Sequence, residues 1–301
     1  DLHLGNIALD DGELIIFDGI EFNPALRWID TMSELAFLLM DLDDGDRREL
    51  AQRILNSYLQ NSGDYAGLAL LRFYQVYRAM VRCKVAAIRL QQADNGLQRA
   101  ELEAAFSSYL ELALGYTQPT ATALLITHGL SGSGKSTVSG ELILRLPAIR
   151  LRSDVERKRL AGLPAWSETD STLGGGIYSS GFTQKTYARL LELAQSIMNA
   201  GFIVIVDATF LQPAPRRAFA DLADHLQKPF LILDFQVPKE ELRNRVERRR
   251  KQSADASEAD IAVLQSQLAV FSPLTEAERR RALIISPSRS LSLDELKARL
   301  Y

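Results

Sequence analysis

The sequence predicts an α/β protein in two parts, a mostly helical first part and a second part with a parallel sheet flanked by helices. Apolar residues recur at helical spacing between residues 27 and 115, whereas short apolar strands alternate with helical stretches after residue 122. The segment GYTQPTAT separates the two patterns, and its glycine, proline and polar residues are typical of a linker. We therefore expect one domain at 1–117 and a second at 118–301.

The composition is that of an ordinary globular protein. The chain has 301 residues, of which 47% are hydrophobic and 24% charged, and its formal net charge is −3. This balance leaves no room for extensive disorder and excludes a global basic surface for nucleic acid. The single Cys83 excludes an intramolecular disulfide, and the apolar runs are too short to span a bilayer. We expect a cytoplasmic protein without a membrane partner.

The first part is expected to begin with loops around one strand, near Glu13–Phe17, and to become helical at Arg27. One of its helices has apolar residues mostly three or four positions apart, the spacing of a single buried helix face. A further helix is predicted over Leu97–Leu114. The helix with this apolar spacing lies before it, and its predicted buried face consists of Leu68, Leu71, Tyr74, Val81, Val85 and Ile88.

The second part alternates between strands and helices. Alternation of this kind favours a parallel sheet with helices on both of its faces. The predicted strands are the apolar runs at 123–127, 148–151, 202–206, 230–235 and 282–286.

The most specific motif is GLSGSGKS at 129–136, between the first of these strands and a helix. It matches G-x-x-x-x-G-K-[ST], in which glycines let backbone N–H groups turn toward phosphates and the helix start adds its positive dipole end. Lys135 would reach the outer phosphates, and the Ser136 hydroxyl can bind Mg²⁺. The predicted nucleotide contacts are Gly129, Ser131, Gly132, Ser133, Gly134, Lys135, Ser136 and Thr137.

Asp154 follows the second strand of this part, a place that faces the ligand crevice in an open α/β sheet. From there its carboxylate could accept the proton of an attacking hydroxyl. The structural alternative is that Ser153 and Glu156 form a capping box, beside which Asp154 only favours the helix dipole. The two interpretations are compatible, and we favour the catalytic one.

Asp207 ends the third strand of this part, beside the predicted phosphate cradle. A carboxylate in this place is typical of a residue that orients Mg²⁺. The structural alternative is a helix N-cap, a role that Thr209 could take instead. We favour magnesium binding by Asp207 together with Ser136.

Basic residues dominate the stretch ELRNRVERRRK at 241–251. Arg245 and Arg249 are four residues apart and share one helix face, from which guanidinium groups could stabilise charge on a transferring phosphoryl group. The alternatives are a solvated helix face and a stripe that binds nucleic acid. We expect a solvated face for most of these arginines and phosphate contact for Arg245 and Arg249.

Four segments together resemble the P-loop small-molecule kinases, a group that holds gluconate and shikimate kinases, polynucleotide kinase and the zeta toxins. They are GLSGSGKST, SDVERK, VDATF, and LRNRVERR followed by DASEAD, and the resemblance covers 122–301. It implies that Asp154 is the general base and that 255–267 forms a lid and a helix. It further implies that Lys135 and the arginines that lead into this lid, Arg245 and Arg249, stabilise charge on the phosphoryl group. It also implies ATP and Mg²⁺ as ligands and a small hydroxylated molecule as acceptor.

The glycine-rich stretch at 166–187 is expected to be a long loop, and long loops in compact domains tend to be functional. We predict that it helps to form the acceptor pocket, with Arg157, Tyr178 and Thr183 as candidate contacts and Gly174–Gly176 as a hinge. The alternative is a surface crossover with no part in binding.

At the start of the chain, DLHLGN and FDGIEF resemble the catalytic loop and the metal-binding segment of aminoglycoside phosphotransferases. The resemblance covers about residues 1–115 and implies that Asp1 is a base, that Asn6 and Asp18 bind metal, and that the helices to Leu114 are a kinase-like C-terminal lobe. The alternative is an ordinary polar loop beside one short strand.

Parts of that kinase-like fold are missing from the sequence, namely the His-Gly before the loop, the phosphate-covering loop and the lysine that clamps ATP. We therefore expect the first site to be inactive in this chain. We also expect the chain to be the C-terminal part of a bacterial fusion of an aminoglycoside-phosphotransferase-like domain and a P-loop kinase, whose full length supplies the N-terminal lobe. A natural remnant that serves as a scaffold is the alternative.

Three functional hypotheses follow from these motifs. The leading one is an ATP- and Mg²⁺-dependent kinase for a small hydroxylated acceptor, acting at 129–137. The second is a nucleic-acid 5′-hydroxyl kinase, which the net charge of −3 and the scarcity of aromatic residues near 241–251 disfavour. The third is a nucleotide-sensing module in which ATP binding reorients the helical half, and the combination of Asp154, Asp207 and the arginine helix disfavours it.

Overall fold

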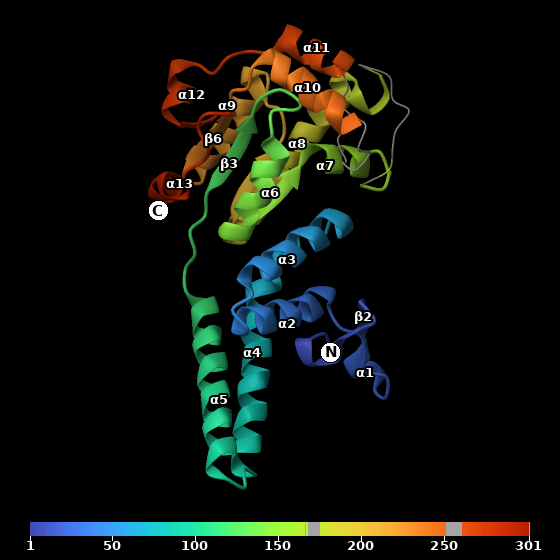
Figure 1. The fold of residues 1–301 in the computed structure, drawn as a ribbon, viewed down its shortest axis with the longest axis vertical. Coiled ribbons are helices and arrows are strands. Elements are labelled where there is room, and N and C mark those ends of the chain that lie inside the picture. The colour runs from blue at the N-terminus through green and yellow to red at the C-terminus, as the bar shows by residue number, and fades with distance from the viewer. Residues whose placement is uncertain (166, 168–174, 251–260, 301) are drawn as a thin grey trace. The chain divides into compact units, whose positions relative to one another are not determined.

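The structure is a computed structural model that describes residues 1–165, 167, 175–250 and 261–300, with the side chains of Arg249 and Arg250 left out (Figure 1). It divides into two compact units, residues 1–59 with 64–119 and residues 60–63 with 120–301. Within the described chain, every helix is too short or too polar to cross a lipid bilayer.

The first unit begins with a hairpin that follows the short helix η1 (Leu4–Asn6). Strand β1 (Ile7–Asp10) pairs antiparallel with β2 (Glu13–Ile16). The two turn residues, Asp11 and Gly12, have φ of 46° and 85°, and positive φ at both positions is what a type I′ turn requires. The strand expected near 13–17 is thus confirmed. Its partner β1 was not predicted, although the Asp-Gly dipeptide between two apolar runs is the signal that could have revealed it.

The rest of the first unit is helical, with α4 and α5 side by side as a long antiparallel hairpin (Figure 1). Its core lies where α2, α4 and α5 meet, around Phe37, Met40, Ala79, Cys83 and Tyr109. The helices are α1 (Pro24–Arg27), α2 (Thr31–Asp44), α3 (Arg48–Ser62), α4 (Leu68–Gln91) and α5 (Gly96–Thr117).

The buried face of α4 differs from the predicted one after its first turn. Ile88 is 50% exposed, and Tyr74, Val81 and Val85 are only partly buried. From Ala79 onward small side chains take the buried positions, because two helices that pack closely over many turns leave no room between them for larger ones. The residues that are buried are Leu68, Leu71, Gln75, Ala79, Cys83 and Ala86.

The second unit is built on a five-stranded sheet in the order β4-β5-β3-β6-β7, and all of its strand pairs are parallel. The predicted parallel sheet is therefore confirmed, and each predicted strand is found with its ends shifted by no more than one residue. The strands are β3 (Leu124–His128), β4 (Ala148–Arg152), β5 (Ile203–Asp207), β6 (Phe230–Phe235) and β7 (Ala282–Ile285).

Helices cover both faces of this sheet, as predicted. Side chains alternate between the faces of a strand, and Leu125, Ile205 and Leu233 pack against α6 and α13 on one of them. Helices α8 and α9 contact β3, β4, β5 and β6 on the other. The helical elements of this unit are α6 (Lys135–Arg145), α7 (Ser153–Leu160), η2 (Gly176–Tyr178), α8 (Ser180–Asn199), α9 (Pro213–His225), α10 (Lys239–Arg250), α11 (Ile261–Val270), α12 (Glu276–Arg280) and α13 (Leu293–Leu300).

The loop predicted at 166–187 is shorter than expected. Helix α8 already begins at Ser180, because the Ser179 side chain accepts a hydrogen bond from the backbone N–H of Phe182 and caps the helix. The predicted contacts Tyr178 and Thr183 therefore lie on η2 and α8 rather than on a loop. Of the predicted hinge, Gly174 lies outside the described residues.

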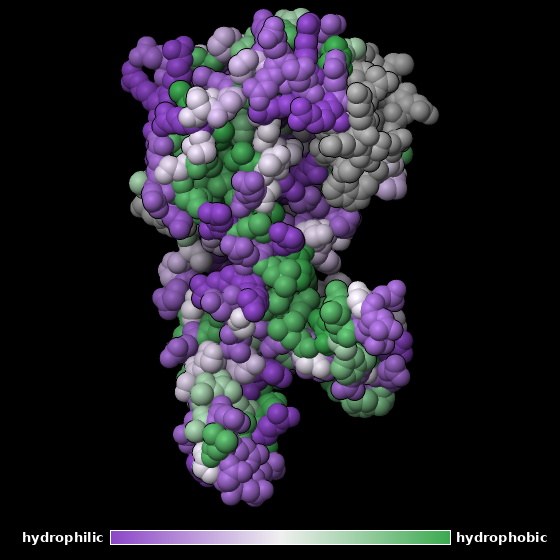
Figure 2. Space-filling view, viewed as in Figure 1, coloured by the Kyte–Doolittle hydropathy of each residue, from purple (hydrophilic) through white to green (hydrophobic). Residues whose placement is uncertain are grey.

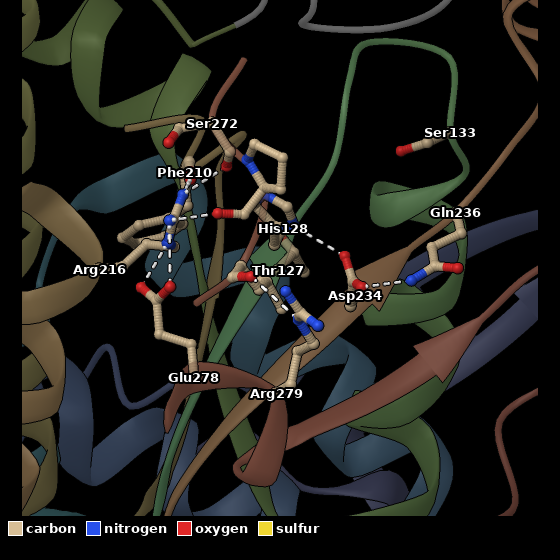
Figure 3. Close-up of polar contacts among 12 residues, drawn as sticks. Thr127, His128, Ser133, Phe210, Arg216, Asp234, Gln236, Ser272, Glu278 and Arg279 are labelled. Atoms are coloured by element: carbon tan, nitrogen blue, oxygen red, sulfur yellow. Dashed lines mark hydrogen bonds and ion pairs between the residues drawn. The ribbon is translucent and has the colours of Figure 1, made fainter. Parts of the chain in front are cut away.

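A buried arginine joins three segments of the second unit (Figure 3). Arg216 on α9 is 1% exposed, and its guanidinium pairs with both carboxylate oxygens of Glu278 on α12, at 2.6 and 3.1 Å. Its Nη1 donates to the carbonyl oxygens of Phe210 and Ser272, at 3.0 and 3.1 Å. Arg216 thereby fixes the segment after β5 and the segment after α11 to the same helix.

The pKa of Glu278 reflects this pairing. Burial by itself would raise that pKa, but hydrogen bonds from Arg216 and Thr275 outweigh burial, and the pKa lies below its ordinary value of 4.5. A carboxyl group whose pKa is lowered by folding stabilises the fold above its unfolded pKa. This stabilisation is lost as the pH falls through the lower, folded-state pKa.

We expect Glu278→Ala to lower the free energy of unfolding of the second unit by about 3–5 kcal/mol, because it leaves the Arg216 charge buried without its partner. Urea-dependent hydrogen exchange of the β3 and β5 amides measures this loss. Glu276→Ala is the matched control, since the Glu276–Arg280 pair on the same helix is 81% and 78% exposed and contributes less than about 1 kcal/mol. Equal losses in the two variants would contradict the role assigned to Arg216.

Candidate functional site

The candidate site lies at the carboxyl end of β3, where the loop 129–134 leads into α6. Strand β3 is the middle strand of the sheet, with β5 on one side and β6 on the other. The chain builds the sheet first toward β4 and β5 and then toward β6 and β7, so the winding direction reverses beside β3. Ligands of open α/β sheets bind at the carboxyl ends of strands at such a reversal.

The base of the loop is attached to both neighbouring strands. On one side, the Thr127 hydroxyl lies 2.6 Å from the carbonyl oxygen of Ala208 and accepts a hydrogen bond from the backbone N–H of Ala208 at 3.0 Å. The backbone N–H of Gly129 donates to the carbonyl oxygen of Thr209 at 3.1 Å. On the other side, His128 Nδ1 lies 2.7 Å from Asp234 Oδ1 (Figure 3). These bonds fix where the loop leaves the sheet.

Within the loop, glycine is required where the backbone is left-handed and crowded. Gly132 has a φ of 81°, and a Cβ there would lie 3.0 Å from Val246 Cγ2 and 3.1 Å from the Leu242 carbonyl oxygen. Gly134 has a φ of 94°. A side chain at Gly132 would therefore be strained by the positive φ and crowded against α10.

The loop presents donors that have no protein partner. Among the residues that the structure describes, the N–H groups of Gly132, Gly134, Ser136 and Thr137 make no hydrogen bond. The last two are at the start of α6, where the helix dipole adds partial positive charge. Unpaired N–H groups that converge at a helix start form a binding site for an anion.

Lys135 is buried and folded back over the loop. Its Nζ donates to the carbonyl oxygen of Leu130 at 2.7 Å and lies 3.4 Å from Ser133 Oγ. The ammonium group therefore lies against the loop backbone, where a phosphate held by the N–H groups would be within its reach.

Asp207 is buried at the end of β5 and does not cap a helix, because α9 begins only at Pro213 and has Gln212 as its N-cap. The structural alternative for Asp207 was therefore wrong. Its Oδ2 accepts from the Ser139 hydroxyl at 3.1 Å, and Ser139 Oγ also lies 3.3 Å from the carbonyl oxygen of Ser136. Ser139 was not predicted, although its position one turn after Lys135 was a signal for it.

The oxygen atoms near the loop suit Mg²⁺ better than they suit a metal ion whose ligands all come from the protein. Mg²⁺ is usually bound by one or two carboxylates, several waters and phosphate oxygens of the substrate. The described part of the chain contains no group of three His, Cys, Asp or Glu side chains that could enclose a metal. A single carboxylate, Asp207, beside the turn that carries Ser136 fits a metal that is completed by a phosphate.

Asp154 lies in the first turn of α7, directly after β4. The capping box considered for this helix is not formed, because the helix already begins at Ser153 and its N-cap, Arg152, makes no side-chain capping bond. Glu156 is instead 1% exposed and paired with Arg159. Since Arg152 pairs in register with Asp207 of β5, Asp154 lies in the first turn of a helix that starts at the same end of the sheet as Asp207.

The three predicted acceptor contacts lie together although they come from three elements. Arg157 Nη1 donates to the Ile177 carbonyl at 2.6 Å and to the Thr183 hydroxyl at 3.2 Å, and its guanidinium carbon lies 5.2 Å from the ring centre of Tyr178. Tyr187 is close by, and its pKa is raised, mainly by burial. The charges of two neighbours also act on this pKa: Arg157 lowers it and Asp154 raises it. Asp154 and Arg157 therefore act on the same small region.

Arg245 on α10 is placed beside the loop, whereas its neighbours face solvent. A Cβ on Gly134 would lie 3.8 Å from Arg245 Nη1, and the same guanidinium pairs with Glu241. Arg243 and Arg248 are exposed, and the visible surface over α10 is hydrophilic (Figure 2). The side chain of Arg249 and the predicted lid residues 255–260 lie outside the described residues, and 261–267 is helical as predicted.

The three candidate residues of the first unit are also brought together. Asn6 is buried, and its Nδ2 donates to the carbonyl oxygens of Asp1 and Asp18 at 2.9 and 3.4 Å. The backbone N–H of Leu2 beside them donates at 2.8 Å to Glu34, a residue that was not predicted to take part.

Two contacts at the second unit's site could not have been predicted from the sequence. Gln267 on α11 bonds to Ser131 of the loop, and Arg216 on α9 bonds to Phe210 and Ser272. Neither residue was assigned a role at the loop, and Gln267–Ser131 and Arg216–Ser272 join residues that are far apart in the sequence.

The parallel sheet, the glycine loop, the buried lysine and the helix that follows define a P-loop kinase-like α/β fold. The chain belongs to the AAA domain family, whose model matches residues 124–274.

Comparison with known proteins gives the following similarities. The chain is 30% identical over 262 residues to the uncharacterized protein Rv2004c of Mycobacterium tuberculosis, a match that covers 87% of this chain and 51% of that protein. It thus spans about half the length of the curated relatives it matches. Chaetomium thermophilum Kti12 in complex with ADP-AlF3 is 14% identical with a TM-score of 0.47, over 59% of this chain and 99% of that one. Mycobacterium tuberculosis APS kinase CysC in complex with AMPPNP and APS is 20% identical with a TM-score of 0.41, over 60% and 95%.

We expect Gly132→Ala to push α10 away from the loop, because the added Cβ meets backbone as well as side chain. Gly162→Ala is the matched control: its φ is also positive, at +73°, but no atom lies within 4 Å of the added Cβ. Both variants carry backbone strain of about 1 kcal/mol, and Gly132→Ala adds about 1–3 kcal/mol of overpacking. Faster hydrogen exchange in α10 for Gly132→Ala alone is the expected result, and equal exchange would contradict it.

Proposed function

We propose that the second unit is an ATP- and Mg²⁺-dependent kinase that transfers the γ-phosphate of ATP to a hydroxyl group of a small molecule. The observation that carries this proposal is the loop 129–136, which has unpaired N–H groups and lies beside the ammonium of Lys135 and the guanidinium of Arg245. Donors and positive charges along one loop favour an anion with several oxygens, which a chain of phosphates supplies.

The residues around the loop suggest how the transfer proceeds. The acceptor hydroxyl oxygen forms a bond to the γ-phosphorus while the bond between that phosphorus and the bridging oxygen of ADP breaks. Asp154 takes the proton of the hydroxyl, and Lys135 and Arg245 stabilise the charge on the phosphoryl group. Asp207 and Ser136 would hold Mg²⁺, which neutralises negative charge on the phosphate oxygens.

The proposed acceptor site lies around Arg157 and Asp154. Arg157 is buried, and within the described residues its guanidinium contacts a carbonyl, a hydroxyl and an aromatic ring but no carboxylate, while its Nε has no hydrogen-bond partner. A buried positive charge without an anionic partner is costly. This arrangement favours an acceptor that carries a negative group as well as the reacting hydroxyl.

We further propose that the first unit is the C-terminal lobe of an aminoglycoside-phosphotransferase-like domain. The meeting of Asp1, Asn6 and Asp18 supports this. So does the apolar surface around the hairpin, visible in Figure 2, where Leu14 is 75% and Phe22 is 84% exposed. We propose that in the full-length protein a further lobe covers this surface.

If the two units hold independent sites, Asp1→Ala should leave transfer at the loop 129–136 unchanged. A loss of that transfer in Asp1→Ala would contradict the independence of the two sites.

We expect Lys135→Ala to reduce ATP-dependent transfer by a factor of about 10²–10³, the effect of removing one charged donor at a transition state. ADP release, measured over a panel of hydroxylated metabolites that differ in charge, tests this. The control is Lys228→Ala, because Lys228 is an exposed lysine of the same unit that lies before β6, away from the loop 129–136. Full turnover in Lys135→Ala would show that the loop 129–136 is not the catalytic site.

We expect Asp154→Asn to lower kcat by a factor of about 10²–10⁴, because the amide cannot take the hydroxyl proton. The affinity for ATP should stay within about twofold, since Asp154 is assigned to the acceptor and not to the nucleotide. Kinetics and calorimetry on the same preparation separate the two effects. Asp221→Asn, an exposed aspartate on α9, is the control, and a weaker ATP affinity with unchanged kcat in Asp154→Asn would refute the assignment.

A further inference from the structure

We propose that Gln267 is a positioning residue for the terminal phosphate of ATP. Its side chain holds Ser131, and through Ser131 it sets the part of the loop that receives that phosphate. This inference rests on the proposed function of the loop 129–136. It assigns to Gln267, a residue with no predicted contact to the nucleotide, a part in nucleotide selection.

Gln267 forms hydrogen bonds to Ser131 through both the oxygen and the nitrogen of its carboxamide. Gln267 Oε1 accepts from the backbone N–H of Ser131 at 2.8 Å, and Gln267 Nε2 donates to Ser131 Oγ at 2.9 Å. Two bonds of opposite direction fix the orientation of both partners. The carboxamide offers a donor and an acceptor in one planar group without a charge.

This pair is distinct from the apolar packing that already holds α11 in place. Leu264 of α11 packs with Leu130, Leu242 and Val246, which provides the general attachment of the helix to the loop and to α10. The carboxamide adds a specific restraint on a single backbone N–H of the loop. Because Ser131 is buried, that N–H would have no partner without Gln267, and a buried unpaired N–H favours rearrangement of the loop.

The restraint acts at the end of the loop that receives the outer phosphates. In loops of this pattern the lysine reaches the outer phosphates, and backbone N–H groups cradle the inner ones. Here Lys135 Nζ lies 2.7 Å from the carbonyl oxygen of Leu130, the residue next to Ser131. The unpaired N–H groups of Ser136 and Thr137 lie at the opposite end, at the start of α6. Ser131 therefore belongs to the terminal-phosphate end.

A neutral side chain suits this place. A glutamate at 267 could still accept from the Ser131 N–H, but it would bring negative charge to the end of the loop that has to accept the most negative phosphate. Gln267 supports the loop without that repulsion.

The test compares two nucleotides by titration calorimetry in the presence of Mg²⁺. We expect Gln267→Ala to weaken binding of the non-hydrolysable triphosphate AMPPNP about three- to tenfold, because it removes two hydrogen bonds to Ser131 whose net contributions are each modest. The affinity for ADP should change by less than about twofold, because ADP lacks the phosphate at this end. Gln267→Glu should weaken AMPPNP binding more than Gln267→Ala does.

Three further variants control the result. Gln265→Ala changes an exposed glutamine on the same helix and should alter neither affinity. Ser131→Ala removes the hydroxyl partner and leaves α11 unchanged, so it keeps the test valid if Gln267→Ala lowers the melting temperature. The double variant Gln267→Ala with Ser131→Ala should lose less AMPPNP affinity than the two single losses combined, as residues that share an interaction do.

The outcomes separate this inference from the proposed function. Equal weakening of AMPPNP and ADP would overturn the inference, because Gln267 would then support the loop as a whole, and unchanged affinities would overturn it as well. If the unaltered protein binds both nucleotides and Lys135→Ala weakens both, the nucleotide site of the proposed function stands whatever Gln267 does, and ADP release with an acceptor tests the transfer separately. If the unaltered protein binds neither nucleotide, the proposed function fails and the inference fails with it.

Discussion

The candidate site depends on one constraint, that the carboxyl ends of β3, β5 and β6 are held together. Parallel pairing aligns the strands, and side chains complete the alignment where the pairing ends. Thr127 bonds to Ala208 beyond β5, and His128 bonds to Asp234 of β6. Because both bonds lie directly before Gly129, the loop leaves the sheet from a fixed point with Asp207 beside it. The cradle can then be built from backbone alone.

The loop is also supported from outside the sheet. Gly132 lies against the backbone of α10, and Ser131 is held by Gln267 of α11. The segment that follows α11 is in turn fixed by Arg216, which bonds to Ser272 and to Phe210 beyond β5. The β5 end and the helices over the loop are thus tied to the same buried guanidinium. A displacement of α9 would therefore move both the end of β5 and the segment after α11, which lie on two sides of the loop 129–134.

The parts of the fold that could be predicted are those that local sequence specifies. The strands of the second unit are continuous apolar runs, and the loop 129–136 is specified by glycines whose conformation few other residues adopt. The buried face of α4 could not be predicted beyond Leu71, because helical periodicity does not show that a neighbouring helix requires Ala79 and Cys83 at the contact. Gln267 is a polar residue on a surface helix until the fold brings it to Ser131, which precedes it by more than a hundred residues.

The short helix α7 relates the proposed nucleotide and acceptor sites to each other. It begins directly after β4, at the level of Asp207, and it carries Asp154 and Arg157 one turn apart on the side that approaches η2 and α8. Glu156 and Lys158 on the same helix are buried, so α7 has little freedom to turn about its axis. The proposed base, Asp154, and the cation Arg157 thus share one rigid turn of α7, which fixes their positions relative to the proposed phosphate site. On this view the reacting hydroxyl is positioned by α7, and η2 and the start of α8 decide which molecule carries it.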